Sequence, residues 1–404
     1  MALLGILLVA LTLRLAVAAI SPIIDFVNAD IPLSSVTIGI IGALPPIFFA
    51  LSGFLAPLVA RRLGLELALV VAISLMVVGH LARAFAPTYL VLVIGSAVAL
   101  LGMGLGNVLL PPAVKRYFPD RIALVTSAYA TLLAVSTAVP ALIAAPVADA
   151  AGWRTSLAVW SIVAGVALVP WVMLLVRHRA ETAAQTVAAR PDEAPEVEAP
   201  TAALVGRLWH SRIAIAIAVA FAVSALNAYA NFAWLPEILG DTTGMSAQTA
   251  GLMLSIYSFA GFPASIVVPI LVARMKNVGI LVFVAVIFFV VGYVGLIVAP
   301  QTATLAWVVL IGLGPLLFPV CLVLINSRTR THAGSVALSG FAQGVGYTVG
   351  ALGPLVVGVL HDVTGGWTIP LIFLVVVALA AIYAAIELRS PRFIEDELAA
   401  RSAP

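Results

Sequence analysis

Charged residues and cysteine are scarce in this sequence. Only 9% of its 404 residues are charged, with 20 Lys and Arg and 17 Asp and Glu, whereas 63% are hydrophobic. A soluble domain carries about 25% charged residues, so this composition excludes a cytosolic enzyme, a secreted disulfide scaffold and a disordered chain. Cys321, the single cysteine, cannot form an intramolecular disulfide, and its apolar surroundings in the sequence predict a packing role.

The sequence also lacks the motifs of nucleotide, metal and nucleophile chemistry. The glycine-rich segment from Gly102 to Asn107 has no Lys-Ser/Thr pair after it and follows no strand, so it is not a phosphate-binding loop. No Cys/His spacing fits a metal, and no Ser, His and acid arrangement suggests a nucleophile. We therefore predict that the protein is not an enzyme and that it has no cofactor and no metal.

Long apolar runs fill most of the chain. A bilayer core about 30 Å thick needs roughly 20 apolar residues of helix, and a helix satisfies its own backbone hydrogen bonds in lipid. The sequence predicts an all-α integral membrane protein with twelve transmembrane helices, at residues 2–27, 36–59, 67–86, 89–112, 122–146, 154–176, 213–236, 248–273, 279–299, 303–326, 334–360 and 367–387. The first run is not a signal peptide, because it lacks a basic start and continues for a full span.

A polar stretch divides the spans into two groups of six. It is rich in arginine, proline and acids, which is typical of a solvated linker. We predict an N-terminal six-helix bundle at 1–176, a cytoplasmic linker at 177–212, a C-terminal six-helix bundle at 213–390 and a cytoplasmic tail at 391–404.

The placement of the cations predicts the orientation. With both termini cytoplasmic, 17 of the 20 cations lie in inside segments: Arg61, Arg62, Lys115, Arg116, Arg121, Arg177, Arg179, Arg190, Arg207, Arg212, Arg274, Lys276, Arg328, Arg330, Arg389, Arg392 and Arg401. Arg83 and Arg154 lie near the outer interface, and Arg14 alone remains. We predict a multi-pass protein of the inner (plasma) membrane. The net charge of +3 reflects this topology, so we predict no nucleic-acid partner.

Short motifs repeat between the two groups of spans. Val59-Ala60-Arg61 returns 213 residues later as Val272-Ala273-Arg274, and Gly102 and Gly104 return 210 residues later as Gly312 and Gly314. Pro140 and Trp153 likewise return as Pro354 and Trp367. Two related six-helix halves are the architecture of a rocking transporter, whose site lies near the middle of the membrane between the halves.

These features resemble the major facilitator superfamily over essentially the whole chain. The loop Pro57 to Gly64 keeps the Arg-Leu-Gly of the superfamily's signature but lacks its Asp, so the gating role of that Asp is not carried over. Several segments resemble the cyanate permease family, which includes nitroimidazole exporters: Arg14 with Ser21-Pro22, GNVLLPPAVKRYF from Gly106, AWLPEIL from Ala233, FPVCLVL from Phe318 and FAQGVGY from Phe341. The resemblance implies secondary transport of a small polar or anionic solute by alternating access.

Arg14 is the strongest candidate for substrate binding. An arginine in the middle of a span costs roughly 2.5 to 3.5 kcal/mol and is tolerated mainly when it faces a cavity or a partner. No span offers a carboxylate at this depth, since the nearest acid of the same span, Asp25, lies eleven residues away. We expect an anionic or dipolar substrate to supply the counter-charge. The alternative is an arginine bound to backbone carbonyls that holds two helices apart.

Other polar and aromatic residues at comparable depth extend this candidate site. They are Asn227, which follows Arg14 by 213 residues, Asn231, Tyr257, Gln343, Tyr347, Tyr129, Asn107, Phe48 and Phe49. Each has a structural alternative: hydrogen bonds between helices for the asparagines, and packing for the aromatic rings. The glycines around Asn107 favour close helix packing, with Asn107 capping or bridging there.

Three residues are candidates for coupling transport to a proton: Asp25 and Glu237 near the outer mouth, and His80 near the outer end of the third span. A histidine close to the interface is more often solvated or capping, and a facilitator or an anion exchanger would need no coupling residue. The partners we predict are the bilayer, a small-molecule substrate and a proton, with the chain as a monomer.

Two other functions compete with the transport of an anion. A proton-coupled multidrug efflux antiporter usually has a carboxylate within the membrane and a Gly-Pro-Gly-Gly type motif in the fifth span, where this sequence has Ala138-Val139-Pro140-Ala141. A sensor would need a soluble output domain, and a channel would not need two related halves. We therefore favour a secondary transporter, with the efflux antiporter as the alternative.

Overall fold

The computed structural model of this protein describes residues 1–33, 35–188 and 206–400, and every regular element in these ranges is helical. Eleven helical segments are long and apolar enough to cross a membrane, and a shorter apolar stretch, Ala2–Ala18, precedes them. The predicted all-α class is confirmed. The structure also places a membrane-length segment at each of the other eleven predicted spans.

The elements of the N-terminal half are α1 (Ala2–Thr12), α2 (Leu15–Ala18), η1 (Ser21–Ile23), α3 (Ile24–Asp30), α4 (Ser35–Leu63), α5 (Leu65–Ala84), α6 (Tyr89–Tyr117), η2 (Pro119–Arg121), α7 (Ile122–Ala151) and α8 (Trp153–Ala188). Those of the C-terminal half are α10 (Arg212–Thr243), α11 (Ala247–Arg274), α12 (Gly279–Val298), α13 (Thr304–Leu313), η3 (Gly314–Leu316), α14 (Leu317–Ser327), α15 (His332–Thr364), α16 (Thr368–Glu387) and α17 (Ile394–Ala400).

The first predicted span is not one continuous helix. The α1 helix ends at Thr12, and Arg14 has φ −127° and ψ −1°, outside the helical region, before α2 begins. A 3-10 turn with a proline then leads into α3. The predicted span at 2–27 is thus divided into shorter helices, and the interruption falls at Arg14, the cation that the predicted membrane topology leaves unexplained.

The helices form two compact units that do not coincide with the two halves of the sequence. Unit 1 comprises Met1–Asp120, Leu132–Val205 and Thr331–Gly340, and unit 2 comprises Arg121–Thr131, Gly206–Arg330 and Phe341–Pro404. The first turns of α7 and of α15 thus each belong to the unit built mainly from the other half. In unit 1, Ser339 Oγ donates a hydrogen bond of 2.6 Å to Val108 O, and in unit 2, Ser127 Oγ donates one of 2.8 Å to Ile266 O.

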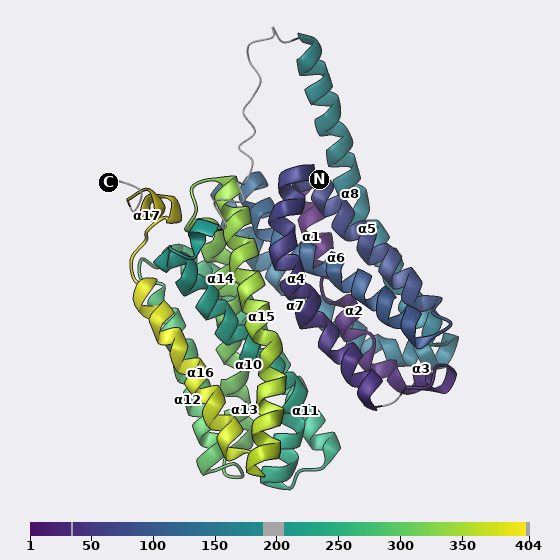
Figure 1. Ribbon diagram of the computed structural model, residues 1–404, viewed down its shortest axis with the longest axis vertical. Helices are drawn as coiled ribbons and strands as arrows, with labels where there is room; N and C mark the ends of the chain where they lie inside the picture. The colour runs from purple at the N-terminus through teal and green to yellow at the C-terminus, as the bar shows by residue number, and fades with distance from the viewer. Residues whose placement is uncertain (34, 189–205, 401–404) are drawn as a thin grey trace. The chain divides into compact units, whose positions relative to one another are not determined.

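Within unit 1, α6 packs against α5, α4 and α1 (the unit is shown in Figure 1). A Cβ atom added at Gly102 would collide with backbone atoms of α5, one at Gly104 with Ser52 of α4, and one at Gly106 with the side chain of Leu13. The predicted role of these glycines in close packing is confirmed. Gly106 in particular lets α6 approach the chain at the interruption beside Arg14.

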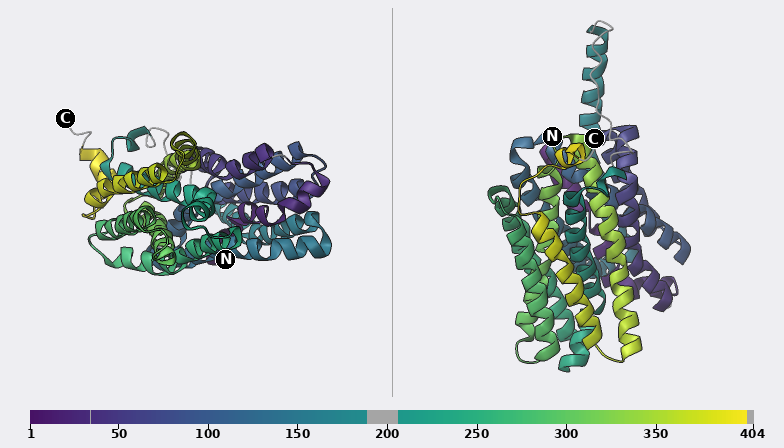
Figure 2. Two further views of the ribbon diagram at one scale, coloured as in Figure 1. Left: turned by 90° about the horizontal axis from the view of Figure 1, so that it is seen from below. Right: turned by 60° about the vertical axis from the view of Figure 1, so that its left-hand side comes forward.

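Within unit 2, α12 and α16 run side by side, as Figures 1 and 2 both show. The α15 helix packs on α10 through glycines spaced three or four residues apart. A Cβ atom at Gly346 would meet the ring of Phe221, and one at Gly350 would lie 2.9 Å from Cβ of Ala225. These contacts hold Tyr347, on α15, against α10.

The same contact between a tryptophan and an aspartate occurs at one end of each half. Trp153 Nε1 donates a hydrogen bond of 2.9 Å to Asp30 Oδ2 in the first half, and Trp367 Nε1 donates one of 2.8 Å to Asp241 Oδ2 in the second. Each contact ties the last membrane helix of a half to its first segment. The repeat of Trp153 as Trp367 is therefore structural as well as sequential.

The two polar segments differ from simple solvated chains. The α8 helix continues to Ala188, past the predicted start of the linker at 177, and extends beyond the helices packed around it (Figure 1). Residues 189–205 of the predicted linker lie outside the described residues. Near the carboxyl end, α17 folds back on the start of α10.

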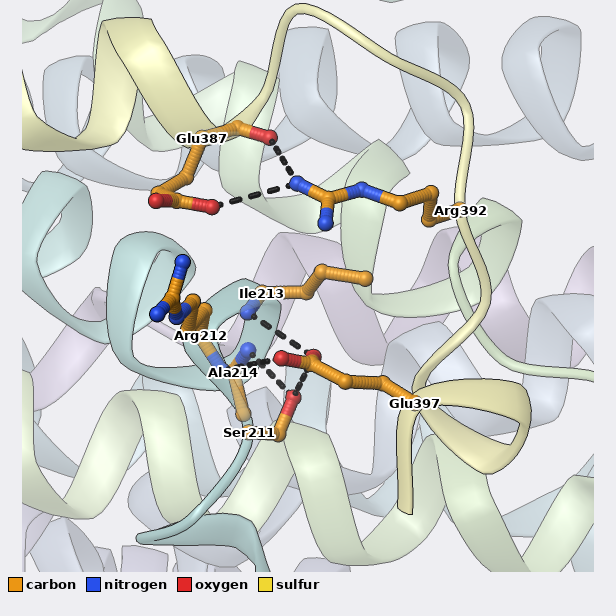
Figure 3. A network of polar contacts seen from close by, with 7 residues as sticks. All are labelled: Ser211, Arg212, Ile213, Ala214, Glu387, Arg392 and Glu397. Atoms are coloured by element: carbon orange, nitrogen blue, oxygen red, sulfur yellow. Dashed lines mark hydrogen bonds and ion pairs between the residues drawn. The ribbon is translucent and has the colours of Figure 1, made fainter. Parts of the chain in front are cut away.

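Glu397 of α17 accepts hydrogen bonds from the Ser211 hydroxyl at 2.7 Å and from the backbone N–H groups of Arg212 and Ile213 at 2.9 and 3.3 Å (Figure 3). A carboxylate at this position satisfies the free N–H groups of a helix start and interacts favourably with the helix dipole. Residues 391–400 therefore form part of unit 2 rather than a free tail.

Candidate functional site

Arg14 lies at the break between α1 and α2 and is half-buried. Its guanidinium carbon is 5.1 Å from the centre of the Phe49 ring, and Nη1 donates a weak hydrogen bond of 3.3 Å to Leu13 O. No ion pair of Arg14 occurs in the described part of the chain. A cation over an aromatic face is only partly stabilised, so this guanidinium can still bind an anion.

The structure brings Phe49 to Arg14. Two other predicted residues adjoin residues that pack there: Phe48 precedes Phe49, and Asn107 follows Gly106, which packs against Leu13. Phe49 is buried and forms the surface beneath the guanidinium, whereas Phe48 is half-buried. Asn107 is buried on α6. Unit 1 thus contains Arg14, Phe48, Phe49 and Asn107.

Asn227 and Asn231 form a buried hydrogen-bond network with Tyr293 of α12. Asn231 Nδ2 donates to Tyr293 Oη at 2.6 Å and to Asn227 O at 2.7 Å, and Tyr293 Oη donates to Asn227 Oδ1 at 2.8 Å. Asn227 Nδ2 donates to Val223 O at 2.8 Å. All three side chains are essentially inaccessible to solvent. The asparagines therefore join α10 to α12, as the structural alternative predicts, and Asn231 Oδ1 has no hydrogen-bond partner among the described residues.

The remaining predicted residues of unit 2 cluster around buried aromatic rings. Tyr257 packs edge-on against Phe232, and its hydroxyl lies close enough to that of Tyr293 for the two to interact electrostatically. Tyr347 packs edge-on against Phe221, with ring centres 5.1 Å apart, and it interacts electrostatically with Tyr129. Gln343 is buried one turn before Tyr347 on α15.

Tyr293 is the residue that sequence reasoning missed. It lies in an otherwise apolar run, GILVFVAVIFFVVGYVGLIV, in which it is the only residue with a side-chain hydroxyl. A lone tyrosine in such an apolar run indicates a polar contact between helices, because a buried tyrosine hydroxyl usually has a hydrogen-bond partner. The pattern does not say which helix supplies that partner.

His80 and Arg83 differ from the sequence expectation. Both were expected to reach the outer interface, His80 as a solvated or capping residue, but both side chains are fully buried. None of their side-chain nitrogens has a hydrogen-bond partner in the part of the chain that the structure describes. Gly79 and Gly95 let α5 and α6 approach so closely that these side chains are enclosed.

The acidic coupling candidates lie apart from these groups. Glu237 is exposed near the carboxyl end of α10 and makes no ion pair among the described residues. The side chain of Asp25 lies outside the described part of the structure. No group of three or more metal-ligating side chains occurs within the described ranges.

Comparison with known proteins places this chain in a family. The family described as Major Facilitator Superfamily matches residues 6–351 and 217–402. The chain belongs to the Major Facilitator Superfamily. This superfamily member is a multi-pass membrane protein and a secondary transporter of a small molecule, not an enzyme.

Two transporters of Escherichia coli (strain K12) are related to this superfamily member over most of their length. The 2-nitroimidazole transporter is 32% identical over 379 residues, which cover 93% of this chain and 92% of the relative. The cyanate transport protein is 24% identical over 372 residues, which cover 90% and 91%. The predicted resemblance to a family containing both kinds of transporter is confirmed at this distance.

A solved structure has the same fold. The proton:xylose symporter bound to 6-bromo-6-deoxy-D-glucose matches with a TM-score of 0.76 at 16% sequence identity, over 99% of this chain and 98% of the symporter. This likeness confirms the predicted major facilitator fold.

Proposed function

We propose that this transporter carries a small anionic or strongly dipolar solute, of the cyanate-like or nitro-aromatic class, by alternating access. Arg14 binds the negatively charged end of that solute. The observation that carries the proposal is the half-buried guanidinium at a helix break, which rests on Phe49 and has no carboxylate partner among the described residues.

The chemistry of Arg14 fits the solutes named for the relatives. A guanidinium presents several N–H donors in one plane, which suits a nitro group or a small oxyanion. Two relatives that match most of the chain are named for 2-nitroimidazole and for cyanate, and both solutes carry negative charge or a strong dipole on a few atoms. The remaining predicted residues, Phe48, Asn107, Tyr129, Gln343 and Tyr347, are proposed to line the route of the solute.

Uptake by purified protein in liposomes tests the role of Arg14. Arg14→Gln should lose at least about tenfold in affinity for cyanate and 2-nitroimidazole, because it removes a charge-assisted contact, and Arg14→Lys should lose part of it. Arg392→Gln, which removes a largely exposed cation from the C-terminal segment, is the matched control and should bind as the wild type does. Unchanged affinity in both Arg14 variants would refute the proposal.

An imposed pH gradient tests coupling to a proton. The candidates are Asp25, Glu237 and His80. A proton on His80 would place a second buried positive charge three residues from Arg83, so we expect His80→Gln to retain transport. If a pH gradient drives uptake, Glu237→Gln and Asp25→Asn should abolish that drive, and uptake that ignores the gradient would show facilitation or exchange.

A thermal-shift screen separates this proposal from multidrug efflux. A ligand stabilises the state that binds it, so small anions and nitro compounds should raise Tm. Stabilisation by cationic drugs alone would instead favour a proton-coupled efflux antiporter.

A further inference from the structure

The amide of Asn231 has a fixed orientation. Its nitrogen lies 2.7 Å from the backbone carbonyl oxygen of Asn227, which can only accept a hydrogen bond, so the amide nitrogen rather than the amide oxygen must face it. The second N–H of the same amide donates to the Tyr293 hydroxyl at 2.6 Å. Both donors of Asn231 are therefore used.

The proton of Tyr293 closes the network. Its hydroxyl donates to Asn227 Oδ1 at 2.8 Å while it accepts from Asn231, so Tyr293 cannot also donate to Asn231. Only the acceptor Oδ1 of Asn231 remains, and it has no hydrogen-bond partner in the described ranges although the residue is 1% exposed. Buried carbonyl oxygens almost always accept a hydrogen bond, so this atom lacks a donor.

A second unpartnered group lies in the same cluster. The Tyr257 hydroxyl is buried and has no hydrogen-bond partner among the described residues, and it interacts electrostatically with Tyr293. Residues from α10, α11 and α12 thus present one fixed acceptor, Asn231 Oδ1, and one hydroxyl without a partner among the described residues, with no cation and no carboxylate in the hydrogen-bond network. Such a site suits a neutral polar edge of a ligand and not its anionic end.

We propose that Asn231 Oδ1 accepts a hydrogen bond from a ring N–H group of the transported solute, with Tyr293 as the positioning residue that holds the amide in this orientation. The inference rests on the proposed function and narrows its substrate class. Nitro-substituted heterocycles with a ring N–H satisfy this acceptor, whereas the cyanate ion has no hydrogen to donate. The protein therefore selects the former class over the latter.

A matched pair of ligands tests the donor requirement. 2-Nitropyrrole and 2-nitrofuran are planar five-membered rings with the same nitro group, and only the pyrrole has a ring N–H. The wild-type protein in detergent should bind 2-nitropyrrole at least about tenfold more tightly than 2-nitrofuran, since the furan leaves a buried acceptor unpaired. Equal affinities, or no binding of either compound, would overturn the inference.

Variants assign the discrimination to this network. Asn231→Ala removes the acceptor and should reduce the pyrrole-to-furan ratio to about one. Tyr293→Phe removes one of the two contacts that hold the amide, while the Asn227 carbonyl remains, and should reduce the ratio in part. Tyr383→Phe, on a tyrosine of α16 that is 39% exposed, is the control and should keep the wild-type ratio. If both Asn231→Ala and Tyr293→Phe kept the wild-type pyrrole-to-furan ratio, the assignment to this network would be refuted.

Arg14→Gln separates the two proposals. It should weaken both ligands by the same factor and leave their ratio unchanged, because the nitro group is common to both. If Arg14→Gln changes neither affinity while the ratio stays high, the role of Arg14 fails and the Asn231 inference stands. If Arg14→Gln weakens the binding of both ligands but the wild-type protein binds them equally well, the role of Arg14 stands and the Asn231 inference fails.

Discussion

At the scale of single residues, Arg83 is a buried charge. No hydrogen bond in the described structure compensates for its burial. It lies in the last turn of α5, where the helix dipole favours a cation, but it is fully buried and its guanidinium nitrogens have no partner among the described residues. A buried charge without a partner has a desolvation penalty of roughly several kcal/mol that no attraction offsets, so its replacement by a well-packed apolar side chain should be stabilising. We predict that Arg83→Leu raises Tm by about 2 °C or more.

Differential scanning fluorimetry of the purified protein measures this effect. Arg154→Leu is the matched control, because it removes an arginine that is exposed and paired with Asp30, and it should produce no rise in Tm. A lower Tm for Arg83→Leu would mean that Arg83 has a counter-charge, such as a bound anion, in the protein as it exists in solution.

Asp30 gives a prediction for the dependence of stability on pH. The Arg154 guanidinium, and then the Trp153 indole, hold the pKa of this carboxyl below its usual value of 3.8. A lowered pKa in the folded state means that the contact stabilises above the unfolded value and is lost as the pH falls through the folded value. The Tm deficit of Asp30→Asn should therefore be constant from about pH 7 to 5, shrink as the pH falls below 3.8, and vanish only once the pH is below the lowered pKa of the folded state.

Thermal unfolding between pH 3 and 7 provides the measurement. Asp149→Asn is a suitable comparison, since Asp149 is exposed and has no described partner, and its difference from the wild type should not vary with pH in this way. A deficit for Asp30→Asn that was no smaller at pH 3 than at pH 5 would show that the carboxylate form is not what Trp153 and Arg154 recognise.

At the scale of elements, the sequence predicts where helices lie better than where they stop. Hydropathy locates the spans because lipid demands continuous apolar runs, but it cannot detect the break at Leu13 and Arg14, where the residues remain apolar on both sides. It also ends the sixth span at 176, whereas α8 continues to Ala188 through polar residues that favour helix as readily as coil. The length and polarity of a segment show whether it can cross the membrane, whereas its backbone hydrogen bonds determine where the helix ends.

Two glycines on different helices should respond to alanine in opposite directions. A Cβ atom at Gly102 of α6 would collide with backbone of α5, whereas nothing lies within 4 Å of one at Gly165 of α8. Alanine is favoured over glycine in a helix by about 0.8–1 kcal/mol where space permits. Gly165→Ala should therefore raise Tm, and Gly102→Ala should lower it by several degrees because α5 and α6 must separate. Stability that rises in both variants would contradict the packing of these helices.

At the scale of the whole molecule, the repeat was readable from the sequence, but the pairing of residues between helices was not. Trp153 and Trp367 keep equivalent contacts with Asp30 and Asp241, as the repeat suggests. By contrast, the sequence pairs Gly102 with Gly312, yet Gly312 packs on Tyr257 of the second helix in its half, as Gly104 does on Ser52. Helical register shifts by a fraction of a turn between distant repeats, so short motifs give the architecture while contacts such as Asn231 with Tyr293 require coordinates.

The orientation in the membrane is the remaining prediction at this scale. The excess of Lys and Arg in alternate loops predicts that the loop after α11 is cytoplasmic and that the loop after α12 faces outward. Lys276 and Gln301 are exposed residues of these two loops. With Cys321 replaced by Ser, an impermeant maleimide added to intact spheroplasts should label Gln301→Cys at once and Lys276→Cys only after permeabilisation. Serine is close to cysteine in size and its hydroxyl can donate to Ile217 O as the buried thiol does, so this replacement should keep the fold. The reverse labelling pattern would invert the topology, because the cations would then face the outside, against the charge bias that directs insertion.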